Sequence, residues 1–222
     1  MSGTLIVLEG TDGCGKSTQF SKLCSYLERE NKPVQRLVFP QYKEESSALI
    51  RMYLRGDFGS NPSDVNPYAA STFYAVDRYA SFRKLWQSYY EQGGIVLADR
   101  YTTSNAVHQA AKLPKEARSA FFQWLFEFEY QRLGLPAPTL TLYLDLPTEF
   151  SLRLLRERES KTHTQADIHE ANADYLAACH ESALQVAAEY GWTQISCLDA
   201  KGVLRGIDDI HAEIINCITP YI

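Results

Sequence analysis

Short apolar runs alternate with longer segments of mixed polarity along the chain. The runs are rich in Val, Ile and Leu and only a few residues long, which is typical of buried strands. They lie at residues 4–9, 34–39, 95–98, 139–144 and 193–198. Because at least one helical segment separates each run from the next, the pattern predicts a parallel sheet covered on both faces.

Between these runs, apolar residues recur at helical spacing, as Phe20, Leu23 and Leu27 do. Helices are expected at residues 16–30, 46–54, 67–91, 102–111, 114–133, 149–159, 167–190 and 207–218. Asn66 and Pro67 suit the cap and the first position of the third of these helices. Residues 56–67, which are rich in Gly, Pro and Asn, and the polar residues 160–165 are expected to be loops.

Strands that alternate with helices predict an α/β fold, a doubly wound parallel sheet of five strands with helices on both faces. The sequence contains no internal repeat and no low-complexity linker. We therefore expect a single domain over residues 1–222 rather than two smaller ones.

The composition narrows the classes of protein. The 222 residues are 45% hydrophobic and 22% charged with a net charge of −5, which excludes a disordered, collagenous or coiled-coil chain and argues against a nucleic-acid partner. The apolar run 5–8 is too short for a signal segment or a membrane span. The five cysteines form no C-x-x-C pair, so neither a disulfide framework nor a zinc site is indicated. We expect no membrane association and a cytoplasmic location.

Residues 10–17 match the phosphate-loop pattern G-x-x-x-x-G-K-[ST]. They lie between the first predicted strand and helix, the context that this motif requires; a chance match in a tight turn is the alternative. Glycines let backbone N–H groups approach phosphate, and Lys16 would reach the β- and γ-phosphates of a bound nucleotide while the Ser17 hydroxyl binds Mg²⁺. The expected nucleotide-binding residues are Gly10, Thr11, Asp12, Gly13, Cys14, Gly15, Lys16, Ser17 and Thr18.

A second phosphate site is indicated at Asp99 and Arg100, directly after the third predicted strand. Ligands of open parallel sheets bind at the carboxyl ends of the strands, and Arg100 suits a bidentate clamp on phosphate. Asp99 would orient Arg100 or receive Mg²⁺ through water, although a surface ion pair is the alternative. Two adjacent phosphate sites indicate phosphoryl transfer between nucleotides.

Two further groups of side chains suit a nucleobase. Tyr74 and Arg78 lie four residues apart on one face of a predicted helix, where the ring can stack on a base and the guanidinium can donate to it. A core aromatic beside a surface arginine is the alternative. The polar residues 102–105 open the next helix and either cap it or read a base edge.

In these motifs the chain resembles the thymidylate kinase family, which converts dTMP and ATP to dTDP and ADP. Residues 9–18 match its opening pattern E-G-x-D/E-G-x-G-K-S/T-T, and residues 99–105 match its D-R-Y-x-x-S-N pattern. Phe39-Pro40, the aromatic-x-x-x-Arg of residues 74–78 and the D-x-x-E of residues 167–170 are supportive. The resemblance implies ATP as phosphoryl donor, Mg²⁺ and a homodimer.

The resemblance also implies roles for individual residues. Asp12 would face the transferred group and the acceptor's sugar, and Arg100 would hold the dTMP phosphate. Arg78 and Asn105 would read the thymine edge, with Tyr74, or Phe73 beside it, stacked on the ring. His108 stands where the family often has a Tyr that senses the missing 2′-hydroxyl. The expected substrate-binding residues are Asp12, Phe39, Tyr74, Arg78, Arg100, Ser104, Asn105 and His108, and the expected metal-binding residues are Ser17 and Asp99.

Some family members carry an arginine within the phosphate loop, and this chain has none. Members that lack it are thought to supply the charge from a mobile lid, here expected over residues 153–166 with Arg153, Arg156 and Arg158 at its start; a solvated basic helix face is the alternative. The expected catalytic residues are Lys16, Asp12, Arg100, Arg156 and Arg158.

Two rival functions stay open from the sequence. One is a kinase for another nucleoside monophosphate or for a deoxynucleoside, for which Glu9 could serve as base. The other is a regulatory GTPase, which should carry an N-K-x-D motif that is absent here.

Overall fold

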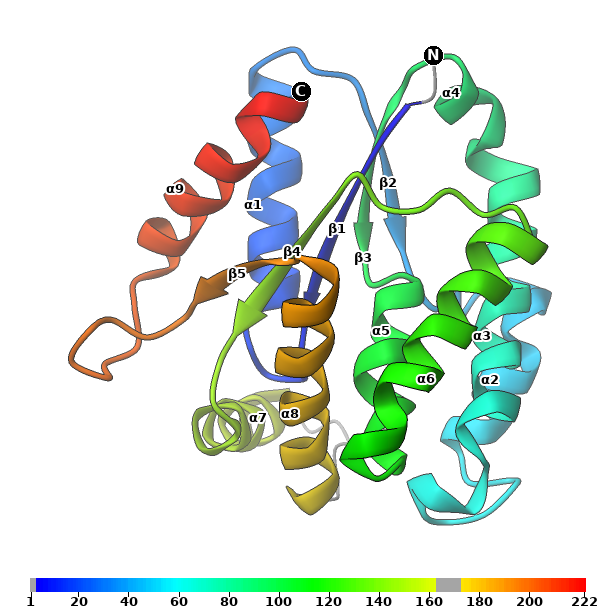
Figure 1. Ribbon diagram of the computed structural model, residues 1–222. Coiled ribbons are helices and arrows are strands. Elements are labelled where there is room, and N and C mark those ends of the chain that lie inside the picture. The colour runs from blue at the N-terminus through cyan, green and yellow to red at the C-terminus, as the bar shows by residue number, and fades with distance from the viewer. Residues whose placement is uncertain (1–2, 163–172) are drawn as a thin grey trace.

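The computed structural model describes residues 3–162 and 173–222 (Figure 1). Its sheet has five parallel strands in the order β2-β3-β1-β4-β5, which confirms the predicted α/β architecture. The strands are β1 (Thr4–Gly10), β2 (Val34–Val38), β3 (Ile95–Asp99), β4 (Leu140–Asp145) and β5 (Thr193–Ser196). Each strand begins and ends within one or two residues of the bounds of a predicted run.

Helices cover both faces of the sheet. They are α1 (Lys16–Arg29), α2 (Ala48–Leu54), α3 (Pro67–Ser81), α4 (Gln87–Glu91), α5 (Thr102–His108), α6 (Lys115–Phe126), α7 (Thr148–Thr162), α8 (Ala173–Tyr190) and α9 (Ile207–Ile218). Alternate residues of β1 point to opposite faces: Ile6 and Leu8 join the core beneath α1 and α9, whereas Leu5 and Val7 join the core on the other face. Figure 1 shows α1 and α9 on one side of the sheet and α3, α5 and α6 on the other.

Two of the long expected helices differ from the prediction. The expected helix 67–91 is interrupted by a π-helical segment, η3 (Phe82–Trp86), and the expected helix 114–133 ends in a second one, η5 (Glu127–Arg132). The wider turn buries Trp86 completely against Phe82, with 4.6 Å between the ring centres. Periodicity cannot predict an inserted residue of this kind, because the apolar pattern on either side is unchanged.

Smaller corrections concern helix ends. The expected helix 46–54 consists of a 3₁₀ turn, η1 (Glu45–Ser47), followed by α2, and the expected helix 102–111 is α5 followed by η4 (Ala110–Lys112). The loop 56–67 contains a 3₁₀ turn, η2 (Pro62–Asp64). Residues 160–162 belong to α7 rather than to a loop. The Asn66 cap is confirmed, since its Oδ1 accepts from the Ala69 N–H at 2.8 Å.

The strand order brings the two predicted phosphate sites together. β1 and β3 are neighbours in register, with Leu8 opposite Asp99, so the phosphate loop that follows β1 lies beside Arg100 at the same edge of the sheet. No helix in the described part of the chain is both long and apolar enough to cross a membrane.

Candidate functional site

Two adjoining cavities open at the carboxyl edge of the sheet. The loop cavity is lined by residues 12–18 of the phosphate loop together with Val38, Phe39, Pro40, Tyr42, Asp99, Arg100, Leu154 and Leu155. The inner cavity, of about 190 Å³, is lined by Asp12, Phe39, Pro40, Tyr42, Leu54, Tyr74, Arg78, Arg100, Tyr101, Ser104, Asn105, His108 and Gln109. Five residues line both cavities, and Asp12 and Arg100 are the two charged ones among them, so their charges lie where the cavities meet.

The phosphate loop depends on glycine at two positions. Gly13 and Gly15 have φ values of 83° and 86°, in the left-handed region that side chains disfavour. Gly13 also packs against α7, where an added Cβ would lie 2.7 Å from the Ser151 carbonyl oxygen. Gly15 caps α1 without a side-chain hydrogen bond, which leaves the first N–H groups of the helix for an anion.

Lys16 and Cys14 point inward from this loop. The Lys16 ammonium is largely buried and donates to the Gly10 carbonyl at 3.1 Å, across the turn that would surround a phosphate. Burial raises the pKa of the Cys14 thiol, so Cys14 is a neutral packing residue. Ser17 and Thr18 are exposed on the cavity wall.

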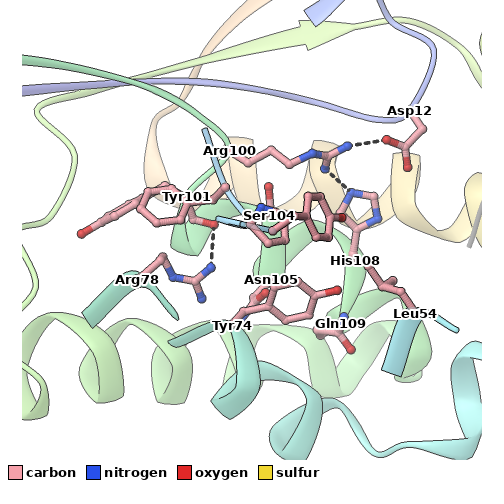
Figure 2. A pocket seen from close by; sticks show the side chains of 13 residues that line it. Asp12, Leu54, Tyr74, Arg78, Arg100, Tyr101, Ser104, Asn105, His108 and Gln109 are labelled. Carbon is pink, nitrogen blue, oxygen red and sulfur yellow. Dashed lines mark hydrogen bonds and ion pairs between the residues drawn. The ribbon is translucent and has the colours of Figure 1, made fainter. Parts of the chain in front are cut away.

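Arg100 lies between two acceptors, as Figure 2 shows. Its Nη2 donates to Asp12 Oδ1 in an ion pair, and its Nη1 donates to His108 Nε2 at 2.9 Å. The backbone of Arg100 has φ 66°, and its N–H donates to the Leu8 carbonyl of β1 at 3.2 Å. Burial by itself lowers the pKa of the guanidinium, but the carboxylates of Asp12, Glu9 and Asp99 outweigh it and raise that pKa, which keeps Arg100 charged.

Arg78 is not a surface arginine, because it is 1% exposed and forms a buried ion pair. Its Nε and Nη2 donate to the two carboxylate oxygens of Glu129 in η5 at 2.7 and 2.5 Å. A third donor, Nη1, reaches the Tyr101 carbonyl at 3.3 Å (Figure 2). Burial lowers the pKa of Arg78, and the Glu129 charge more than compensates. The pair fixes the wall of the inner cavity, and the sequence analysis did not identify Glu129.

The remaining wall of the inner cavity carries an aromatic ring and two amides. Tyr74 lines the cavity, whereas Phe73 packs on Tyr53 and Phe58 with ring centres 6.5 and 5.8 Å apart. The Asn105 amide donates to the Ser71 carbonyl at 3.3 Å.

Gln109 also lines this cavity and was not predicted. It is 1% exposed, and its Oε1 has no hydrogen-bond partner among the described residues. Its position four residues after Asn105 could have revealed it, because that spacing places two side chains on one helix face. A buried carbonyl oxygen without a donor suits a ligand that brings one.

Glu9, considered above as a general base, faces neither cavity. It is fully buried, and its Oε2 accepts from the hydroxyls of Thr103 at 2.8 Å and Ser104 at 2.7 Å. Its Oε1 accepts from the Gly10 N–H at 3.0 Å. Glu9 therefore joins the phosphate loop to α5.

Asp99 and Ser17 both line the loop cavity and provide the oxygen ligands that Mg²⁺ prefers. Asp99 is 8% exposed, and its Oδ1 has no hydrogen-bond partner within the described structure. An orphaned carboxylate oxygen fits a cation that takes its other ligands from water and phosphate. Across residues 3–162 and 173–222, no group of three or more His, Cys, Asp or Glu side chains could hold a metal by itself.

Of the expected lid arginines whose side chains the structure describes, neither Arg153 nor Arg156 lines the loop cavity. Leu154 and Leu155 are the residues of α7 that line the loop cavity. Arg153 lies over the Phe150 ring, 5.1 Å from its centre, and Arg156 is exposed. The side chain of Arg158, residues 163–166 of the expected lid and the motif at 167–170 lie outside the described residues.

The chain is similar to known proteins over most of its length. A family model described as thymidylate kinase matches residues 8–214. The chain is 32% identical over 190 residues to the thymidylate kinase of Mycobacterium tuberculosis (strain ATCC 25618 / H37Rv), covering 85% of this chain and 87% of the relative. It is 30% identical over 197 residues to that of Prochlorococcus marinus (strain MIT 9313), covering 88% and 87%. A probable thymidylate kinase of Thermococcus gammatolerans is 27% identical over 218 residues, covering 97% and 96%. The chain belongs to the thymidylate kinase family.

Proposed function

We propose that this protein is a thymidylate kinase, which transfers the γ-phosphoryl group of ATP to dTMP and yields dTDP and ADP. The observation that carries this proposal is that Asp12 and Arg100 belong to both cavities. A phosphate loop on one side and a base-sized cavity with an aromatic ring and two amides on the other support a direct transfer between two nucleotides.

ATP would occupy the loop cavity. The N-terminus of α1 and Lys16 would hold its phosphates, with Lys16 exchanging the Gly10 carbonyl for phosphate oxygens. Ser17 and Asp99 would hold Mg²⁺, which when bound neutralises charge on the donor phosphates.

dTMP would occupy the inner cavity. Arg100 would bind its phosphate with the N–H groups that Asp12 and His108 leave available, so that the attacking oxygen lies beside the donor. Tyr74 would stack on thymine, while Asn105, Gln109 and the remaining Arg78 donors would meet its polar edges. His108 would lie against the sugar.

The rival kinases are less well supported. A deoxynucleoside acceptor needs a base at its hydroxyl, whereas a monophosphate already carries the attacking oxygen. Glu9, the base considered for that reaction, is buried and accepts three hydrogen bonds.

We further propose that residues 1–222 act as one domain, with residues 153–166 as a lid. The described α7 packs on the phosphate loop through Leu154 and Leu155, which supports closure from this side. Arg156 or Arg158 would then contact the transferring group, where negative charge spreads during the reaction.

We also propose a homodimer and a cytoplasmic location. The outer face of α3 exposes Tyr68, Val76 and Tyr79, of which Val76 is 54% exposed, and Tyr68 extends this face onto Trp124 of α6 with ring centres 4.6 Å apart. All five cysteines are free, which suits a reducing compartment.

A panel of acceptors tests the function. With ATP and Mg²⁺, dTMP should be phosphorylated at least about tenfold more efficiently than dCMP, dAMP or thymidine, measured as ADP release and product identity. Lys16→Ala should lower kcat by about 10²-fold or more, whereas Lys22→Ala, whose partner is the exposed Asp208, should behave as the parent. Preference for thymidine or for another monophosphate would contradict the assignment.

Alanine variants along α7 test the lid. Arg156→Ala or Arg158→Ala should lower kcat by about 10²-fold with a smaller change in the KM for dTMP, because the contact forms mainly in the transition state. The matched control is Arg153→Ala, since that side chain lies on Phe150. If both variants kept the kcat of the parent, no lid arginine would contact the transferring phosphoryl group, and this part of the proposal would be wrong.

Sedimentation equilibrium tests the dimer. The parent should have twice the mass of one chain at micromolar concentration, and Val76→Asp should be monomeric because it places a charge in an apolar contact. Val203→Asp, at a residue that is 58% exposed after β5, serves as control. A monomeric parent would rule the dimer out.

A further inference from the structure

A buried thiol lies behind the imidazole that contacts Arg100. His108 Nε2 faces Arg100 Nη1 at 2.9 Å, and His108 Nδ1 faces the Sγ atom of Cys179 in α8 at 3.5 Å. Cys179 is fully buried, and the transfer reaction does not use it. A continuous series of contacts therefore runs from α8 through His108 and Arg100 to Asp12 in the phosphate loop.

The contact between the Arg100 guanidinium and the ring requires one tautomer of His108. All three nitrogens of the Arg100 guanidinium are donors. His108 Nε2 therefore accepts from Arg100 and carries no proton. The proton of the neutral ring then resides on Nδ1, which is directed at Cys179 Sγ. The opposite tautomer would bring an N–H of the ring against an N–H of Arg100.

The thiol is suited to select this tautomer. Burial raises the pKa of Cys179 well above the ordinary range, so its sulfur is a neutral thiol with lone pairs that can accept from Nδ1–H. Tyr175, four residues earlier in α8, donates to the His108 carbonyl at 2.7 Å. One face of α8 thus holds both the backbone and the ring of His108.

We propose that Cys179 is a positioning residue for the phosphoryl acceptor: it fixes the Nδ1–H tautomer of His108, and His108 in turn holds Arg100 in the orientation that binds the acceptor phosphate. This inference rests on the proposed role of Arg100. Its physical basis is preorganisation, because a guanidinium held by Asp12 and His108 needs no reorientation when the phosphate arrives.

The tautomer can be observed without any turnover. In protein labelled with ¹⁵N-histidine, the ring resonances of His108, assigned by their loss in His108→Gln, should show a protonated Nδ1 and an unprotonated Nε2. Cys179→Ala should shift the population toward Nε2–H or the charged ring. Cys179→Ser removes about as much volume as Cys179→Ala does, but its hydroxyl oxygen can still accept from Nδ1–H. It should therefore retain the tautomer of the parent.

Kinetics then separate positioning from packing. Cys179→Ala should raise the KM for dTMP about threefold to tenfold, which corresponds to the loss of one hydrogen bond, and should leave the KM for ATP unchanged. Cys179→Ser should bring the KM for dTMP most of the way back to that of the parent. In a His108→Gln background, Cys179→Ala should have no further effect, because the two residues act in series. Cys24→Ala, at a buried cysteine of α1, is the control for loss of a thiol from the core.

Two results would overturn the proposal. One is a parent ring protonated on Nε2, or an unchanged ring spectrum in Cys179→Ala. The other is a rise in the KM for dTMP that Cys179→Ser shares in full or that persists in the His108→Gln background, which would make Cys179 a packing residue. If the parent shows the expected tautomer but does not phosphorylate dTMP, the proposed function fails while the link between Cys179 and His108 stands.

Discussion

The placement of the Arg100 guanidinium between Asp12 and His108 is the interaction on which the rest of the site depends. A cation at this point lies between the phosphate loop and a base-sized cavity, where it can meet phosphate groups from both sides. Its backbone has a positive φ, a conformation that costs free energy in a residue other than glycine. The hydrogen bond from its N–H to β1 and the two side-chain acceptors together fix the arginine in that conformation.

The Arg78–Glu129 pair supports the inner cavity in a different way. Both side chains are buried, so neither could lose its partner without leaving an uncompensated charge, which typically costs about 3–5 kcal/mol. Thr102 also donates to Glu129 at 2.8 Å, so one carboxylate joins α3, α5 and η5. These contacts hold the wall that would bind thymine in place without any help from a nucleotide, and base selectivity can then rest on a few amide groups.

Local chemistry made the phosphate loop and most helices and strands predictable from the sequence. The glycines at 13 and 15, the Asn66 cap and the short apolar strands act within a few residues of their own position. Long-range partners were not predictable: Arg78 and Glu129 are 51 residues apart, and His108 and Cys179 are 71 apart. The two π-helical segments were not predicted either, because an inserted residue leaves the apolar pattern on both sides of it unchanged.

A bisubstrate ligand tests the central claim, that Arg100 and Asp12 join two nucleotide sites for direct transfer. Adenosine and thymidine linked through a chain of five phosphates should bind one per protein chain in calorimetry. Its Kd should lie at least about 10²-fold below that of either nucleotide, since the second contact becomes intramolecular. It should compete with both ATP and dTMP. Competition with only one nucleotide, or an affinity no better than that of ATP alone, would show that the cavities do not form one reaction site.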